Sequence, residues 1–136
     1  MKNLTTAIFS KMSGSSFSTA IGGRLYKGAA PDGAEMPYAV YGLISDVPDN
    51  VFSTHGEEAR FQFDLFSSAS GSTEIEDIYT YLKALYDDCS LTITSQTHIC
   101  MKRELAILTV EDYTTPAGTQ KVWHYSVDYE IRTEFT

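Results

Sequence analysis

Residues 59–88 have the sequence ARFQFDLFSSASGSTEIEDIYTYLKALYDD, which predicts a strand, a turn and a helix in that order. In the strand, Phe61, Phe63 and Leu65 alternate with polar residues, so one face of the pleated strand is apolar. The helix carries an apolar stripe at steps of three and four residues, formed by Ile75, Ile78, Leu82, Leu85 and Cys89. Because a short Ser/Gly-rich turn joins these two apolar surfaces, we expect the helix to lie back over the sheet.

The start of this helix has a sequence signal of its own. Thr73 and Glu76 have the spacing of a capping box, in which each side chain accepts a hydrogen bond from a free backbone N–H of the first turn. We therefore expect the helix to begin near Ser72 or Thr73. Tyr79 and Tyr81 cannot both join the apolar stripe, so at least one of them should be exposed.

The other elements follow from the periodicity of apolar residues. Helical spacing predicts a short helix over 4–12 and a further helical turn over 17–21. Extended segments are expected at 24–27, 38–45, 91–94, 98–110 with a bulge near Leu105, and 121–133. We predict a single domain, residues 1–136, with an α+β fold: an antiparallel sheet of about four strands with two or three helices packed on one face.

Two segments are polar and rich in turn residues. Residues 46–58 are acidic and form either a long hairpin loop or a partly ordered arm, and residues 112–121 contain the turn TTPAGT. Loops of such length in compact domains are more often functional than idle. We expect both segments to be exposed and to make contacts.

The charge of the chain limits its partners. Eighteen Asp and Glu residues against ten Lys and Arg residues give a net charge of -8. Nucleic-acid binding draws most of its affinity from cations that displace counterions from phosphate, so general attraction to DNA is disfavoured. No apolar stretch approaches the roughly 20 residues of a membrane span. Cys89 and Cys100 are interpreted as free thiols.

The histidines and cysteines offer one conceivable metal site. His98 and Cys100 lie two residues apart on an expected strand, and His124 falls on the expected neighbouring strand, an arrangement compatible with zinc. Nothing in their spacing is a known metal signature. Packing or surface roles are the favoured interpretation, and we predict no metal and no cofactor.

His55, Glu57 and Glu58 lie together in the acidic segment. A catalytic base or a metal ligand needs fixed geometry, which a turn-rich loop rarely provides, so a solvated loop is the favoured interpretation. The sequence has no phosphate loop, nucleophile elbow, HExxH or CxxC motif. We predict that the chain is not an enzyme.

The polar face of the central and last strands is charged. It carries Arg60 and Asp64 on one strand and Asp128, Glu130 and Arg132 on the other. An uncovered sheet face of mixed charge usually meets solvent. In a ring-forming protein it would line a channel or a seam between subunits.

The whole chain resembles the tail-terminator and tail-completion proteins of long-tailed bacteriophages and prophages, also called head–tail joining proteins. The resemblance rests on the order and spacing of short motifs along one small acidic domain. These motifs are Gly23-Arg24-Leu25-Tyr26, Ala30-Pro31, Pro37-Tyr38, Ser45-Asp46-Val47-Pro48-Asp49, Glu58, Arg60-Phe61-Gln62-Phe63-Asp64-Leu65-Phe66-Ser67, Trp123-His124 and Val127-Asp128-Tyr129.

This resemblance implies a structural protein of the virion tail, assembled in the host cytoplasm and located at the head-proximal end. It implies a homo-oligomer, a hexameric ring that caps the tail tube, ends tube polymerisation and joins the head connector. DNA would pass through its lumen without specific binding, because acidic side chains repel phosphate. No membrane is involved.

In a ring, each subunit uses two different patches, so interface residues should form two groups. The segments 46–58 and 112–121 are expected to reach the tube or a neighbouring subunit. Some rings form only on their template, at high concentration or with a divalent ion that neutralises clustered carboxylates, and the sequence does not distinguish these conditions. The expected interface residues are Asp46, Asp49, Asn50, His55, Glu57, Glu58, Tyr113, Thr115, Gln120, Arg24, Arg60, Asp64 and Arg132.

The sequence is also compatible with two other functions. One is a different virion component, such as a tail tube subunit, which would form long filaments, or a head-completion protein. The other is a small metal-dependent enzyme that uses the histidines, which would contain stoichiometric zinc.

Overall fold

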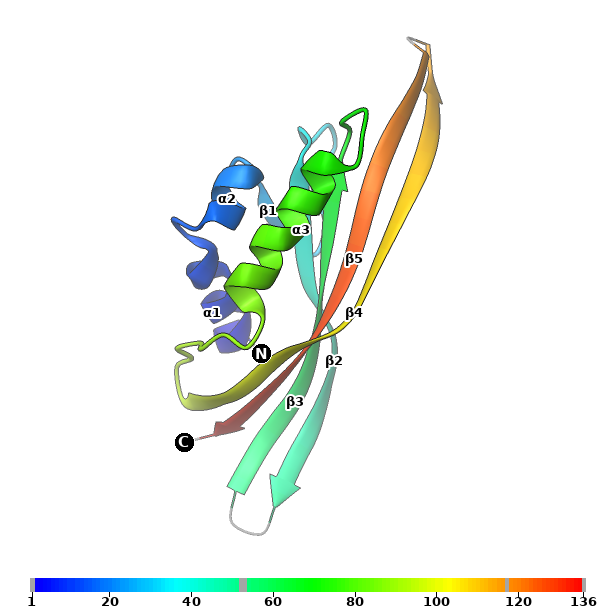
Figure 1. The fold of residues 1–136 in the computed structure, drawn as a ribbon. Helices are drawn as coiled ribbons and strands as arrows, with labels where there is room; N and C mark the ends of the chain where they lie inside the picture. Colours follow the sequence, from blue (N-terminus) through cyan, green and yellow to red (C-terminus); the bar gives the residue numbers. More distant parts are fainter. Residues whose placement is uncertain (1, 52–53, 117, 136) are drawn as a thin grey trace.

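The structure, a computed structural model, describes residues 2–51, 54–116 and 118–135. Its helices are α1 (Lys2–Met12), α2 (Ser16–Ala20) and α3 (Thr73–Tyr86). Its strands are β1 (Leu25–Lys27), β2 (Tyr38–Val51), β3 (Thr54–Ser67), β4 (Gln96–Thr115) and β5 (Gly118–Phe135). The strands form one sheet in the order β1-β2-β3-β5-β4, and the helices lie alongside its middle part (Figure 1).

The predicted fold class is wrong. In place of an antiparallel sheet of about four strands with helices packed on one face, the described residues form a mixed sheet of five strands. β1 pairs with β2 in parallel, from Leu25↔Ala39 to Lys27↔Tyr41, and all other neighbours are antiparallel. About half of the chain lies in strands, which run well past the ends of the short helices (Figure 1). The direction of a strand pair is set by its connection, here residues 28–37, and periodicity within one strand does not reveal it.

Residues 46–58, expected as a long hairpin loop or a partly ordered arm, and residues 112–121, expected as a loop, both belong to paired strands that form hairpin arms. β2 continues through residues 46–51 and pairs with the start of β3, from Asp46↔Ala59 to Val51↔Thr54. β4 and β5 pair through to Thr115↔Gly118. Polar residues fill both faces of these arms, so their composition resembles that of a loop although their backbone is extended. The bulge predicted near Leu105 is confirmed by a shift in register between Arg103 and Leu105.

The predicted contact between the central strand and the helix forms the core. Phe61, Phe63 and Leu65 of β3 are fully buried. The buried side of α3 is formed by Ile75, Ile78, Leu82 and Tyr86. Tyr81 is exposed, and Tyr79 stacks on Tyr125 with ring centroids 4.2 Å apart. The apolar stripe expected from the sequence is therefore confirmed at Ile75, Ile78 and Leu82. Tyr86, the last residue of the helix, continues its buried side.

The cap at the beginning of α3 differs from the capping box that the sequence predicts. The helix begins at Thr73, as predicted, but the capping box does not form. Ser72 occupies the cap position, and its hydroxyl bonds to the Glu76 carboxylate at 3.3 Å, not to a backbone N–H. The Glu74 carboxylate accepts a hydrogen bond from the buried Ser67 hydroxyl at 2.7 Å, which ties the first turn to the end of β3.

Two tyrosine hydroxyls join the layers. The Tyr86 hydroxyl donates to the Ile8 carbonyl oxygen at 2.6 Å, a buried bond between α3 and α1. The Tyr129 hydroxyl donates to Asp87 Oδ1 at 2.6 Å, which joins β5 to the residue that follows α3. Helix α1 has only eleven residues and is marginal by itself, so the bond from Tyr86 and the burial of Leu4 and Ile8 hold it in place.

The substitution Tyr86→Phe tests this tie between helices. Removal of the hydroxyl leaves the Ile8 carbonyl without its buried donor, so we expect the free energy of unfolding to fall by about 1 kcal/mol. Urea unfolding followed by circular dichroism measures it. The matched control Tyr81→Phe, at an exposed position on the same helix, should leave stability unchanged. Equal losses in both variants would contradict the prediction.

Candidate assembly surfaces

The sheet extends beyond the helices at both of its ends. The β2–β3 arm, residues 46–58, projects from one end, and the β4–β5 arm, residues 111–121, projects from the other (Figure 1). The pairing of β3 with β5 ends at Ser67↔Trp123, so the strands of the β4–β5 arm pair only with each other among the described residues. The chain therefore has two arms that project from opposite ends of the sheet.

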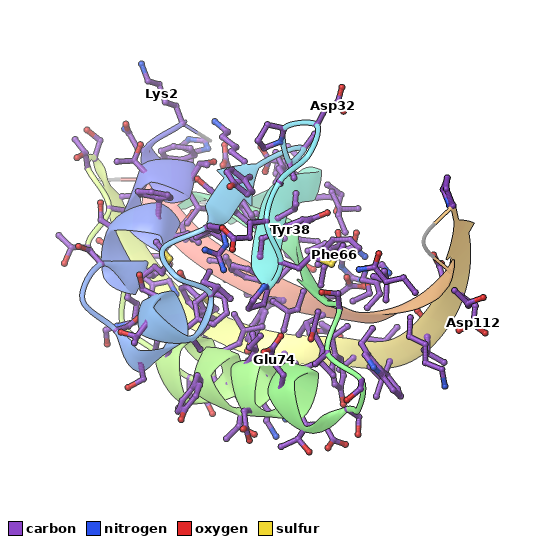
Figure 2. The ribbon with its side chains drawn as sticks, turned by 90° about the horizontal axis from the view of Figure 1, so that it is seen from above. Lys2, Asp32, Tyr38, Phe66, Glu74 and Asp112 are labelled. Carbon is purple, nitrogen blue, oxygen red and sulfur yellow. The ribbon has the colours of Figure 1, made fainter. Side chains whose placement is uncertain are left out.

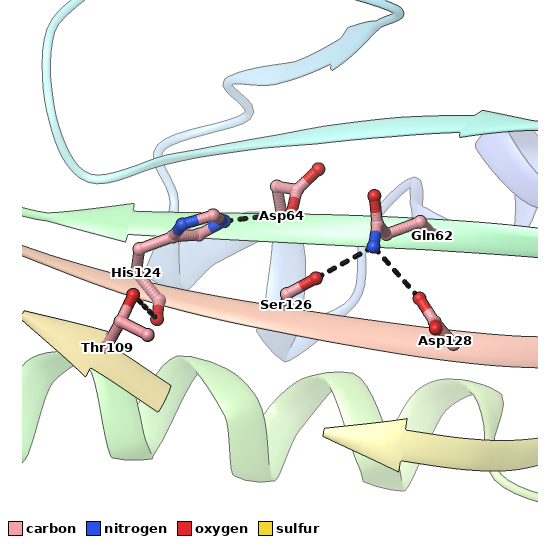
Figure 3. Close-up of polar contacts among 6 residues, drawn as sticks. All are labelled: Gln62, Asp64, Thr109, His124, Ser126 and Asp128. Carbon is pink, nitrogen blue, oxygen red and sulfur yellow. Dashed lines mark hydrogen bonds and ion pairs between the residues drawn. The ribbon is translucent and has the colours of Figure 1, made fainter. Parts of the chain in front are cut away.

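The face of the sheet turned away from the helices carries a polar network, and we call it the open face. Gln62 Nε2 donates to Ser126 Oγ at 2.8 Å and to Asp128 Oδ1 at 3.0 Å (Figure 3). His124 Nε2 lies 2.8 Å from Asp64 Oδ1. These bonds cross from β3 to β5, so they hold the polar side chains in fixed positions and make this face a rigid surface.

An aromatic row crosses the same face. Tyr26, Tyr38, Phe66 and His124 come from β1, β2, β3 and β5, with ring centroids 5.9, 5.0 and 4.5 Å apart in that order. Figure 2 shows Tyr38 and Phe66 side by side on neighbouring strands. Aromatic rings in such a row combine large contact area with little loss of side-chain entropy, which suits a protein contact.

Carboxylates and guanidinium groups gather on the open face where it meets the β2–β3 arm. Arg132 Nη2 lies 3.5 Å from Glu58 Oε2, and Arg132 Nε donates to Glu130 Oε1 at 3.0 Å. A hydrogen bond between the carboxyl groups of Glu104 and Glu130 raises the pKa of Glu104 and lowers the pKa of Glu130. The group holds more carboxylates than cations, so a basic partner or a cation would bind it more readily than an acidic one.

The structure brings some of the predicted interface residues together. Glu58, Arg60, Asp64 and Arg132 share the open face, since they lie on matching register positions of β3 and β5. Asp46, His55 and Glu57 alternate with them, toward the opposite face of the β2–β3 arm.

Other predicted residues lie apart from this group. Gln120 is exposed on the β4–β5 arm, at the other end of the molecule. Arg24 precedes β1, where its Nε donates to the Pro37 carbonyl at 2.9 Å. Four remaining positions have a described backbone in β2 or β4, and their side chains lie outside the described part of the structure; these are Asp49, Asn50, Tyr113 and Thr115.

His98, Cys100 and His124 do not come together as a zinc site. His98 pairs with Thr133 and Cys100 with Arg132, across an irregular step, while His124 pairs with Thr109 in the other half of the sheet. The described residues contain no group of three or more His, Cys, Asp or Glu arranged to hold a metal ion. The Leu91 N–H donates to His98 Nδ1 at 3.2 Å, and burial lowers the pKa of His98, so this histidine is a neutral packing residue.

Sequence analysis missed four apolar residues at the rims of the open face. Ile44 and Val47 of β2 are 51% and 55% exposed, and Leu105 and Ile107 of β4 are 51% and 49% exposed. The shift in apolar phase at Leu105 was a signal that Leu105 and Ile107 point away from the core. β4 is the outermost strand on one side of the sheet, and on the other side the pairing of β1 with β2 ends at Tyr41, so β2 has no outer neighbour beyond it among the described residues. This strand order cannot be read from the periodicity of the sequence.

The Glu57 side chain is partly buried on the β2–β3 arm. Its Oε2 atom is buried and has no hydrogen-bond partner among the described residues. Burial, followed by the nearby Asp46 carboxylate, raises the pKa of Glu57 above its ordinary value of 4.5. A raised pKa means that ionisation at neutral pH disfavours the folded state, so this carboxylate is a candidate for a contact made only after assembly.

The substitution Glu57→Gln should raise the free energy of unfolding at pH 7, because it removes this buried charge. The gain should disappear below pH 4.5, where the carboxyl is protonated in both the folded and the unfolded chain. Urea unfolding at a series of pH values measures both effects. The neighbouring control Glu58→Gln should give no gain, since Glu58 pairs with Arg132. A gain that is independent of pH would count against the assignment.

Comparison with known proteins agrees with an assembly role. The family model described as "Tail completion protein gp17" matches residues 6–134. Among solved structures, a chain of the "Virion of native gene transfer agent (GTA) particle" is similar to this one, with a TM-score of 0.77 at 11% sequence identity over 98% of this chain and 96% of that chain. At this identity the likeness shows the fold alone. No curated protein matches the sequence.

None of the described helices has the length and apolar character needed to cross a membrane. The family model spans nearly the whole chain, and its members are structural proteins of bacteriophage virions. The chain therefore belongs to the family of tail completion protein gp17, and it is a structural protein of the tail region of a phage-like virion.

Proposed function

We propose that this protein forms a hexameric ring on the head-proximal end of the tail tube, where it ends tube polymerisation and joins the tail to the head connector. The observation that carries this proposal is the family match over residues 6–134. A protein that completes a tail must contact the tube on one side and the head on the other. A chain with two contact regions at opposite ends suits that task.

The two arms supply these regions. The β2–β3 arm and the β4–β5 arm project from opposite ends of one continuous sheet (Figure 1). Long paired strands are stiffer than open loops of the same length, so each arm can present residues at a distance from the helices without a large entropic cost on binding. We assign one arm to the tube and the other to the connector.

The acidity of the chain supports passage of DNA through the ring. The net charge is -8, and the open face carries Glu58, Asp64, Asp128 and Glu130 on its central strands. A lumen with an excess of carboxylates repels phosphate, so DNA would move through it without binding.

Tube assembly tests the proposal directly. The tube protein of the same virion is polymerised with and without this chain, and tube lengths are measured in negative-stain images. We expect added protein to stop growth and to leave a ring at one end of each tube, and purified heads to attach only to tubes that carry the ring. Tubes that grow equally long, or that incorporate the protein along their length, would overturn the proposal and favour a tube subunit.

Charge reversal on the arms separates the two contacts. Asp46→Lys lies on the β2–β3 arm and Asp112→Lys on the β4–β5 arm, and both aspartates are exposed. We expect one variant to lose tube termination and the other to lose head attachment, each by about tenfold or more at equal protein concentration. The control Asp77→Lys, exposed on α3, should retain both activities. Loss of the same activity in both arm variants would contradict the assignment.

A further inference from the structure

We infer that the base of the β2–β3 arm contains an internal water site, in which one ordered water molecule bonds to three strands at once. The site lies on the side of the sheet that faces the helices. Its four groups are Glu57 of β3, Thr133 of β5, and Gln96 and His98 of β4. Such a site belongs to the free chain and does not depend on how the protein assembles.

Each of the four groups has a buried polar atom without a hydrogen-bond partner among the described residues. These atoms are Glu57 Oε2, Gln96 Oε1, His98 Nε2 and Thr133 Oγ1. No other buried oxygen or nitrogen is in this state among the side chains that the structure describes. A buried polar group that bonds to nothing costs stability, so nearly all such groups in proteins are satisfied by protein atoms or by ordered water.

Strand register brings the four groups to one place. Thr133 pairs with Glu57 on one side and with His98 on the other, so these residues form a row across β3, β5 and β4. Gln96 lies two residues before His98 in β4, so both side chains leave the strand on the same face. That face is the one that carries the core, because Thr133 is 2% exposed and Ile131, two residues before it, is fully buried.

The row leaves room for a bridging molecule. Neighbouring strands lie about 4.8 Å apart, so the backbones at Glu57 and His98, two strands apart, are separated by roughly 10 Å. Thr133 between them is short, and the unpartnered atoms of the row do not bond to one another. A hollow of about 540 Å³ adjoins this place, with Gln96 and His98 in its wall, and it gives water a route from solvent.

The proton on the His98 ring lies on Nε2. Burial lowers the pKa of His98, so the ring is neutral, and the nearby backbone of Cys100 opposes this shift without a hydrogen bond to Nε2. The Leu91 N–H donates to Nδ1 at 3.2 Å, which leaves the single ring proton of a neutral histidine on Nε2. Nε2 is therefore a hydrogen-bond donor.

The hydrogen-bonding capacities of the four atoms match those of a water molecule. His98 Nε2 and the Thr133 hydroxyl supply two donors. The oxygens of Glu57 and Gln96 supply two acceptors. Because a water molecule accepts two hydrogen bonds and donates two, a single one can satisfy all four atoms.

A cation fits these groups less well. A protonated Nε2 has no lone pair to offer a metal ion, and without it Glu57 is the one ionisable ligand of the four groups. The same proton would point at the ammonium or guanidinium group of a partner. Water is therefore the ligand that the geometry assigns.

The water joins the β2–β3 arm to β4, the strand on the far side of β5. On the open face, the base of the arm is held by Glu58 and Arg132. The water supplies the corresponding tie on the helix side. A partner that contacts Glu57 after assembly has to displace this water or bond to it.

The substitution Thr133→Val tests the site by the sign of its effect. Valine has nearly the same shape and lacks the hydroxyl. If the hydroxyl bonds to a buried water, its loss removes one of these bonds, and we expect the equilibrium constant for unfolding in urea to rise about fivefold. If the hydroxyl bonds to nothing, its removal takes away an unsatisfied group and stability rises. A more stable Thr133→Val protein would therefore overturn the inference.

The control Thr119→Val is exposed on the same strand and should leave stability unchanged. A double-mutant cycle then shows whether the groups share one water. Thr133→Val is combined with Gln96→Leu, which removes the acceptor on β4. Residues that bond to one water are coupled, so we expect the double variant to lose clearly less stability than the sum of the single losses. Losses that add would contradict a shared water.

The water can also be observed in the unmodified chain. A high-resolution crystal structure would locate it, as would NMR cross-peaks between water and the backbone amides of Thr133 and His98. We expect one ordered water within hydrogen-bond distance of at least three of the four atoms. A dry site, or a direct bond between Glu57 and His98, would sink the inference. A loss of stability on addition of a chelator would do the same, because it would mean a bound cation.

Discussion

The packing of Phe63 against Tyr86 is the contact on which the rest of the structure depends. Their ring centroids lie 4.9 Å apart, and Phe63 also lies 5.8 Å from the ring of Tyr129 and 6.3 Å from that of Tyr41. These four fully or almost fully buried rings come from β2, β3, α3 and β5, so a single cluster fixes the helix to three strands. Because side chains alternate along a strand, burial of Phe63 turns Gln62 and Asp64 to the opposite face. The core thus also creates the open face.

Much of this arrangement could be predicted because it is encoded locally. The alternation in β3 and the stripe in α3 are properties of short segments, and they correctly placed Arg60 and Asp64 on the face away from the helix. The same alternation in β5 placed Arg132. Arg132 meets Glu58 because of the register between β3 and β5, two strands that are far apart in the sequence. This register could not be predicted from the sequence and is known only from the structure.

The errors have a common physical origin. Residues 46–58 and 111–121 extend past the helices, so neither segment packs a continuous face on the core and neither shows a clear apolar alternation. Their extended backbone is held by hydrogen bonds to a partner strand, which leave little trace in composition. The parallel pairing of Leu25–Lys27 and the edge positions of Ile44 and Leu105 depend on strand order in the same way. Sequence periodicity reports which side of a strand is buried, and topology decides which strand is outermost.

These features together describe a chain that works through its surfaces. Rigid arms point in opposite directions, and a bonded polar face lies between them. The most direct measurement is cryo-electron microscopy of complete tails that contain this protein. The account predicts one ring at the head-proximal end of each tube. Copies distributed along the tube, or confined to its distal end, would contradict it.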